Sequence, residues 1–250
     1  MNRWKKLTKI FVAVLVGVAL FGVGGTVYWV SRTHPADALA LQALRSDAQV
    51  AVNEQDGITT FEPVGKQASI GLIFYPGAGV DYRAYAPVLR QIAERGYLTA
   101  LVSVPLNIAF FRADAATEVM VRFPGIEIWA VGGHSLGGVV AATYATNHPD
   151  RVDGLVFFAS YPADDGLKNT AIQVISIYGT NDGLASPEQI DESRELLPAD
   201  SLFVPVEGGN HSQFGSYGFQ DGDGIATISA EEQWAEVVEA TAHFLESLVR

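Results

Sequence analysis

Two kinds of apolar segment alternate along most of this chain, and this alternation is the feature that most restricts its fold. Short runs rich in β-branched residues are typical of buried strands, and segments with helical periodicity separate them from about residue 85 onward. The predicted strands are residues 49–53, 58–62, 69–75, 98–104, 126–131, 152–159, 172–178 and 201–206, and the predicted helices are 85–95, 113–122, 136–147, 187–196 and 230–248. This pattern predicts an α/β fold with a mostly parallel sheet of about eight strands and helices on both faces.

The first two predicted strands differ from the rest because no helix separates them. They are joined by Asp56-Gly57, a dipeptide that favours a tight turn with positive φ angles. Residues 49–53 and 58–62 are therefore predicted to form an antiparallel hairpin at one edge of the sheet.

The N-terminus carries an uncharged run of 21 residues, from 10 to 30. At about 1.5 Å per residue such a helix spans the hydrocarbon core of a bilayer, and a buried core helix is a poorer interpretation because the run is apolar on every side. Four basic residues precede the run and only Arg32 closely follows it. By the positive-inside rule this predicts a single-pass anchor in the cell membrane, with the rest of the chain outside the cytoplasm. A secreted protein with a cleaved signal peptide is the alternative, since Ala36-Asp37-Ala38 resembles a cleavage site.

These features give four predicted parts: a cytoplasmic basic tail at 1–9, a transmembrane helix at 10–30, a stalk at 31–46 and one catalytic domain at 47–250.

The net charge is −12, with 16 basic and 28 acidic residues, and all five charges in residues 1–33 are basic. The remainder therefore has 11 basic against 28 acidic residues. A body this acidic has no basic stripe for phosphates, so nucleic acid is a poor candidate partner. The absence of cysteine excludes disulfides and a thiolate nucleophile.

Residues 133–137, Gly-His-Ser-Leu-Gly, stand between a predicted strand and a small-residue helix. A serine at the tip of a strained strand-to-helix turn needs glycines two residues away, so that strand and helix can approach closely. Ser135 is therefore the candidate nucleophile. A glycine loop that only packs, or one that cradles phosphate at a helix N-terminus, is the alternative interpretation.

A serine hydroxyl needs a base, and chain order selects among the five histidines. His211 follows the last predicted strand, at the sheet edge where sites of open α/β sheets lie, whereas the other four fall in the stalk, the elbow, a helix end and the last helix. Asp182 follows the preceding strand and is the candidate acid that orients His211, with Asp164 and Asp165 as rivals.

Donors for an oxyanion are expected from backbone N–H groups of Ala78, in a Pro-Gly-Ala-Gly loop after a strand, and of Leu136 beside the nucleophile. Aromatic residues on nearby loops are candidates for the substrate pocket or for core packing, chiefly Tyr82, Tyr161 and Phe214. Asp221-Gly222-Asp223-Gly224 suggests a calcium loop, but it lacks the twelve-residue ligand pattern, so no metal and no cofactor are predicted.

In this order, the elbow, the Pro-Gly-Ala-Gly loop, Gly-Thr-Asn-Asp-Gly and Gly-Gly-Asn-His resemble the α/β-hydrolase superfamily over residues 47–250. The closest likeness is to its small bacterial branch of dienelactone-hydrolase-like and carboxylesterase-like enzymes. The resemblance implies an α/β-hydrolase fold, and only about a dozen residues between Ala159 and Ile172 leave no room for a large lid.

These observations predict a serine hydrolase that cleaves carboxylic esters of small or medium substrates through an acyl-enzyme. An amidase, a thioesterase or an acyltransferase acting on envelope molecules would use the same residues. A non-catalytic binding module with this fold is a further alternative, because fold does not fix function.

Overall fold

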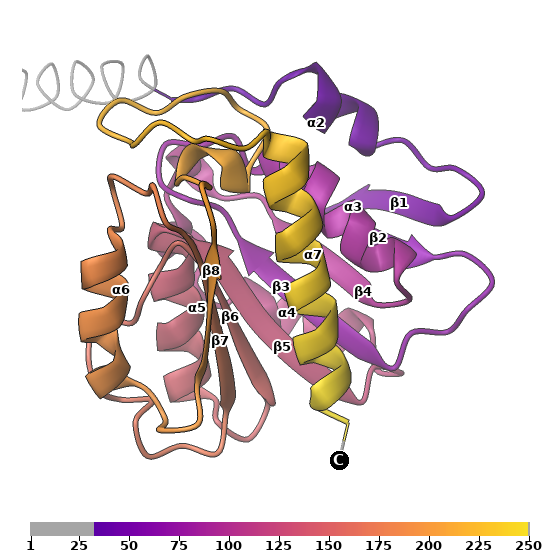
Figure 1. Cartoon of the computed structure of the whole chain (residues 1–250). Helices are drawn as coiled ribbons and strands as arrows, with labels where there is room; N and C mark the ends of the chain where they lie inside the picture. The colour runs from indigo at the N-terminus through magenta and orange to yellow at the C-terminus, as the bar shows by residue number, and fades with distance from the viewer. Residues whose placement is uncertain (1–32, 250) are drawn as a thin grey trace, which may run out of the picture. The chain divides into compact units, whose positions relative to one another are not determined.

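A single eight-stranded sheet forms the centre of the protein (Figure 1), whose computed structural model describes residues 33–249. The strands are β1 (Val50–Gln55), β2 (Ile58–Pro63), β3 (Ile70–Tyr75), β4 (Leu98–Val102), β5 (Ile128–His134), β6 (Gly154–Phe158), β7 (Gln173–Gly179) and β8 (Leu202–Val206). Their order is β1-β2-β4-β3-β5-β6-β7-β8. The pairs β1/β2 and β2/β4 are antiparallel and every other neighbouring pair is parallel. The predicted mostly parallel sheet of about eight strands is confirmed.

The predicted hairpin lies at the β1 edge of the sheet. Gln55 pairs with Ile58, so the loop contains two residues, Asp56 and Gly57, with φ angles of 50° and 70°. Two positive φ angles in a two-residue loop match the twist of an antiparallel pair. This prediction is therefore also confirmed.

Helices cover both faces of the sheet, as the buried side chains of β3 show. Leu72 and Phe74 point into an apolar cluster with α3 and α7, while Ile73 and Tyr75 point into a second cluster with α4 and α5. The bounds are α2 (Ala38–Ala43), α3 (Ala86–Glu94), α4 (Ala115–Arg122), α5 (Leu136–Asn147), α6 (Pro187–Glu192) and α7 (Ala230–Ser247). Short 3-10 turns lie at η1 (Tyr82–Tyr85), η2 (Pro105–Asn107), η3 (Ala109–Arg112), η4 (Ser193–Leu196) and η5 (Ser212–Phe214). The helix predicted at 187–196 thus divides into α6 and η4.

Residues 34–46 do not form the predicted stalk. They belong to the same compact unit as the rest of the domain, which begins at His34 rather than at residue 47. Asp37 caps α2 by accepting from Ala40 N, and its own backbone N–H donates to Ser216 O. The Arg90 guanidinium of α3 donates to the carbonyls of Ala43 and Arg45. These contacts join the segment to α3 and to Ser216.

The predicted transmembrane helix at residues 10–30 lies outside the described residues, as does the basic tail. Between residues 33 and 249, no helix has both the length and the apolarity required to cross a bilayer. Within the same range, the connection from β6 to β7 contains no helix, so no large lid is built there, as expected from its length.

Candidate active site

Ser135 occupies the sharp turn between β5 and α5. Its φ and ψ angles are 51° and −123°, a conformation that side-chain-bearing residues rarely adopt. The turn is possible because its glycines lie against backbone: a Cβ on Gly133 would come within 2.3 Å of Gly137 C, and one on Gly137 within 2.2 Å of Tyr75 O. The Ser135 backbone is fixed by its N–H bond to Phe158 O and by the Ser160 hydroxyl, which donates to Ser135 O at 2.6 Å. The sequence thus forms the strand–turn–helix geometry expected at residues 133–137.

Asp182 and His211 lie on the loops that follow the neighbouring strands β7 and β8. His211 Nδ1 is 2.8 Å from Asp182 Oδ2, and both side chains are almost completely buried. The other carboxylate oxygen, Oδ1, accepts from the backbone N–H groups of Leu184 and Ala185 at 2.8 and 2.7 Å. An ionised carboxylate can only accept, so His211 carries its proton on Nδ1 and Nε2 is left as a base.

The rival acids lie elsewhere. Asp164 and Asp165 are exposed in the β6–β7 connection, and the Asp164 carboxylate accepts from Gly166 N. Of the three candidate acids, the structure places only Asp182 on His211.

His134, the residue before Ser135, contacts His211. The rings of His134 and His211 have centroids 4.4 Å apart, which brings the elbow against the loop that bears His211. Within residues 33–249, Ser135 Oγ and His211 form no hydrogen bond. Such bonds are often long or misaligned in free enzymes and tighten when substrate binds.

In the loop after β3, the backbone N–H group of Ala78 is available to a substrate. Gly77 N donates to the Tyr85 hydroxyl at 3.1 Å and Gly79 N donates to Asn107 O at 2.9 Å, whereas Ala78 N has no acceptor in the described part of the chain. Leu136 N, in the first turn of α5, has none there either. Because α5 packs directly on the backbone of Tyr75 and Pro76, the two free donors lie at the same end of the sheet as Ser135. This arrangement can receive an oxyanion.

The family model described as "Alpha/beta hydrolase family" matches residues 71–235. The chain belongs to the alpha/beta hydrolase family. This match covers the elbow and the loops that bear Asp182 and His211.

Individual relatives share limited parts of the sequence of this family member. It is 28% identical over 130 residues to a pimeloyl-[acyl-carrier protein] methyl ester esterase of a Shewanella species, a stretch that is 48% of each protein. The chain thus spans about half the length of the curated relatives it matches. Among solved structures, it resembles a dienelactone hydrolase from Anabaena variabilis, with a TM-score of 0.60, 17% identity and coverage of 81% of this chain and 100% of that one. It also resembles a monoglyceride lipase from Saccharomyces cerevisiae, with a TM-score of 0.60, 12% identity and coverage of 83% of this chain and 97% of that one. At these identities the two structures show the fold.

The three predicted pocket residues have different surroundings in the structure. Phe214 is completely buried and stacks on His134, with centroids 5.7 Å apart, so it supports the elbow and cannot line an open pocket. The Tyr82 hydroxyl donates to Glu54 Oε1 at 2.9 Å, which turns it toward β1. Tyr161 is half-buried directly after Ser160, at the end of the sheet where Ser135 lies. Of the three, Tyr161 is placed best to meet a substrate.

The sequence did not reveal the pair formed by Tyr85 and His134. The Tyr85 hydroxyl accepts from Gly77 N and lies 2.8 Å from His134 Nδ1, and both side chains are buried. Burial raises the pKa of Tyr85, whereas burial and then the charge of His211 hold the pKa of His134 well below its usual value. Tyr85 therefore donates to a neutral imidazole and ties the Gly77 loop to the elbow. No local motif indicates this pair, because 49 residues separate its members.

Proposed function

We propose that this hydrolase cleaves carboxylic esters of small or medium substrates through Ser135, His211 and Asp182. The observation that carries the proposal is the buried 2.8 Å hydrogen bond from His211 Nδ1 to Asp182, on the loops beside the strained Ser135 turn. A paired, oriented histidine next to a serine at such a turn is the arrangement that activates a hydroxyl for acyl transfer.

The lone pair on His211 Nε2 and the unpaired backbone N–H groups define the steps of the reaction. Ser135 Oγ attacks the ester carbonyl carbon while His211 Nε2 takes the hydroxyl proton. The carbonyl oxygen becomes an oxyanion, which accepts from Ala78 N–H and Leu136 N–H. His211 then gives its proton to the departing alkoxide, and an acyl group remains on Ser135. Water attacks this acyl-enzyme by the same steps in reverse order, which releases the acid.

Asp182 stabilises the imidazolium that forms in both halves of the reaction. Its Oδ1 is fixed by two backbone N–H groups, so Oδ2 is held toward His211 Nδ1. The methyl ester named in the Shewanella relative supports an ester as the bond that is cleaved. Amides, thioesters and acyl transfer to another acceptor would use the same atoms, and the substrate series below separates them.

The test replaces Ser135 with Ala and measures turnover of p-nitrophenyl esters from acetate to octanoate, with matched anilides and thioesters. Loss of an activated nucleophile is expected to lower kcat by about 10⁶. Labelling by a fluorophosphonate is expected at Ser135 in the wild type and is expected to vanish in Ser135→Ala. Ser160→Ala serves as a comparison, because Ser160 only supports the Ser135 backbone. Undiminished turnover or labelling in Ser135→Ala would contradict the proposal.

We also propose that residues 10–30 anchor the chain in the cell membrane with the hydrolase domain outside the cytoplasm. Support comes from the uncharged 21-residue run and from the basic residues that precede it. Protease added to intact cells is expected to digest the domain. A protected domain would contradict this orientation, and a domain found in the medium would indicate cleavage.

A further inference from the structure

Asp223 lies far from Ser135 in the sequence, yet its carboxylate is surrounded by donors from the two loops that bear Asp182 and His211. Oδ1 accepts from Gly183 N at 3.1 Å, His211 N at 3.2 Å and Gly224 N at 2.8 Å. Oδ2 accepts from Ser212 N at 2.7 Å and from the Ser212 hydroxyl at 2.6 Å. One side chain therefore binds the residue after the acid, the base itself and the residue after the base.

The chain on either side of Asp223 strengthens this junction. The Asn210 amide donates to Gly224 O at 2.8 Å, and the Asn181 amide donates to Ile225 O at 3.0 Å. A Cβ on Gly224 would come within 1.9 Å of Asn181 O, and one on Gly183 within 2.7 Å of Gly222 O. The backbones of three segments, 181–183, 210–212 and 222–225, are thus in direct contact. Asp223 and Gly224 of the Asp-Gly-Asp-Gly sequence take part in these contacts.

The same contacts explain why the Asp-Gly-Asp-Gly sequence does not present a cation site at Asp223. All five donors direct the positive ends of N–H or O–H bonds at its carboxylate. A cation in that position would face these dipoles with the wrong sign.

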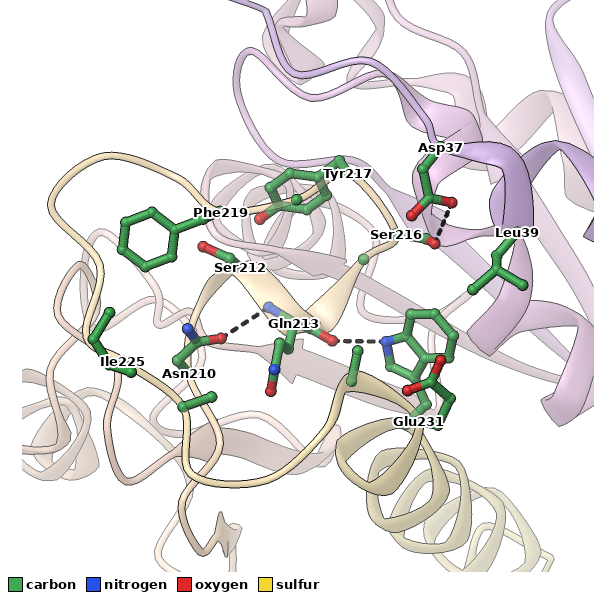
Figure 2. Close-up of a pocket in the computed structure, with 15 residues that line it drawn as sticks. Asp37, Leu39, Asn210, Ser212, Gln213, Ser216, Tyr217, Phe219, Ile225 and Glu231 are labelled. Carbon is green, nitrogen blue, oxygen red and sulfur yellow. Dashed lines mark hydrogen bonds between the residues drawn. The ribbon is translucent and has the colours of Figure 1, made fainter.

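The outer side of the loop that bears His211 is not fully covered by other parts of the chain. A cavity of about 430 Å³ lies there, and Asn210, Ser212 and Gln213 contribute to its wall (Figure 2). On that side the loop is held by hydrogen bonds, including Trp234 Nε1 to Gln213 O at 2.7 Å and the Ser216 hydroxyl to Asp37 Oδ1 at 2.6 Å. On the side that faces the cavity, these polar contacts hold the loop that bears His211.

We infer that Asp223 is a positioning residue that sets the distance and angle between Asp182 and His211. This inference rests on the proposed function, because it concerns the same three residues. Asp223 binds the backbone on both loops at positions adjacent to the two side chains, so a shift of either loop changes the Asp182–His211 bond. Misplacement of a reacting group by about 1 Å can cost about 100-fold in rate.

The chain offers a matched control for Asp223. Asp221 lies two residues earlier, is exposed and makes no hydrogen bond or ion pair within residues 33–249. Asp223→Asn and Asp221→Asn each remove one negative charge from the same segment. In Asp223→Asn the amide turns an N–H group toward the N–H of Ser212 or of His211, so one loop is repelled.

The first readout is the rate at which a fluorophosphonate labels Ser135, which needs no knowledge of the natural substrate. Asp223→Asn is expected to label about 10- to 100-fold more slowly than Asp221→Asn, which should match the wild type. With an ester substrate, kcat should fall by a similar factor while KM stays within about twofold, because Asp223 does not face Ser135. In an Asp182→Asn background the Asp223 substitution should add little, since the bond that it positions is already lost.

The second readout is the low-field NMR signal of the His211 Nδ1 proton, recorded in a Ser135→Ala background. Asp223→Asn is expected to shift this signal or broaden it, and Asp221→Asn is expected to leave it in place. Signals and labelling rates that are the same in both variants would overturn the inference. Failure of the proposed function is recognised separately, because the wild type would then not label at Ser135.

If Asp223→Asn does not fold, Ser212→Ala and Ser216→Ala decide the question. Each removes one 2.6 Å hydroxyl-to-carboxylate bond from the same loop, to Asp223 in the first and to Asp37 in the second. Ser212 also accepts from Gln220 N, so Ser212→Ala removes two hydrogen bonds and Ser216→Ala removes one, and urea denaturation measures how much each variant loosens the fold. Slower labelling in Ser212→Ala than in Ser216→Ala supports the inference, and equal rates overturn it.

Discussion

The nucleophile turn and the acid–base loops hold their residues in different ways. At the turn, close contacts of the glycine backbones restrict Ser135, and most of the residues responsible lie within five positions of it or on the adjacent β3 loop, while Phe158 and Ser160 add two hydrogen bonds from the end of β6. The loops that bear Asp182 and His211 are instead held by hydrogen bonds that the Asp223 carboxylate accepts and that the Asn210 and Asn181 amides donate. The first region resists change through steric exclusion, and the second through polar contacts that single substitutions can remove one at a time.

In the acid–base loops, the largest effect on kcat is expected from replacing Asp182. Asp182→Asn replaces an oxygen that accepts from His211 Nδ1 and leaves the wrong tautomer of the base, so kcat is expected to fall by about 10⁴ with little change in KM. Steady-state kinetics on a p-nitrophenyl ester measures this. Asp164→Asn is the control, since this rival acid is exposed and touches no catalytic group. A comparable loss from Asp164→Asn would remove Asp182 from its assigned role.

The second effect tests whether steric exclusion governs the turn. Gly137→Ala should gain about 1 kcal/mol from helix propensity, but its Cβ would lie 2.2 Å from Tyr75 O and 2.5 Å from Pro76 O. The overlap is expected to dominate and to lower the free energy of unfolding by about 3 kcal/mol, with loss of activity. Urea denaturation checks the change. Gly125→Ala is the control, because its Cβ would meet only Gln67 Nε2 at 3.5 Å. Equal stability of the two variants would show that the turn tolerates a side chain.

The smallest effect concerns a buried polar group within the turn. The pKa of His134 lies well below that of an exposed histidine, so below about pH 6.5 the unfolded chain takes up a proton that the folded chain does not. Folding stability is therefore expected to fall with decreasing pH in this range, by about 1.4 kcal/mol per pH unit from this group. Above about pH 6.5 the group contributes no pH dependence.

His134→Asn removes the titration and keeps an acceptor for the Tyr85 hydroxyl. Urea denaturation at pH 7.5, 6.5 and 5.5 should show a shallower loss in this variant than in the wild type. His243→Asn should behave as the wild type, because that imidazole is exposed on α7. Parallel pH curves for the wild type and His134→Asn would refute the assignment.

The sequence predicted what depends on near neighbours. Alternating strands and helices predicted the sheet, Asp56-Gly57 predicted the hairpin, and the glycines around Ser135 predicted the sharp turn, because each depends on backbone conformation within a few residues. The order of residues along the chain selected His211 and favoured Asp182 over Asp164 and Asp165, and the structure joins His211 to Asp182 directly.

The errors and omissions share a physical cause. Residues 34–46 were predicted to belong to a stalk, but they bind Arg90 and Ser216, which are far away in the sequence. Phe214 looked like a pocket wall because its loop is adjacent to His211, yet it packs on His134. Tyr85 and Asp223 bind groups that no local pattern connects to them. Hydrogen bonds that close long loops leave no periodic trace in a sequence.

The Ser212–Asp223 bond also makes the intervening segment a closed loop. The segment runs from Ser212 to Asp223, where the hydroxyl and the carboxylate meet at 2.6 Å; its first half is buried, and its tip at Gly218, Phe219 and Gly222 is exposed. Compact loops whose ends touch accept length changes at small entropic cost. This tip is therefore a natural insertion point: a cap or a binding element grafted between Gly218 and Phe219 would extend from the loop that bears His211 and leave the contacts of Asp223 in place.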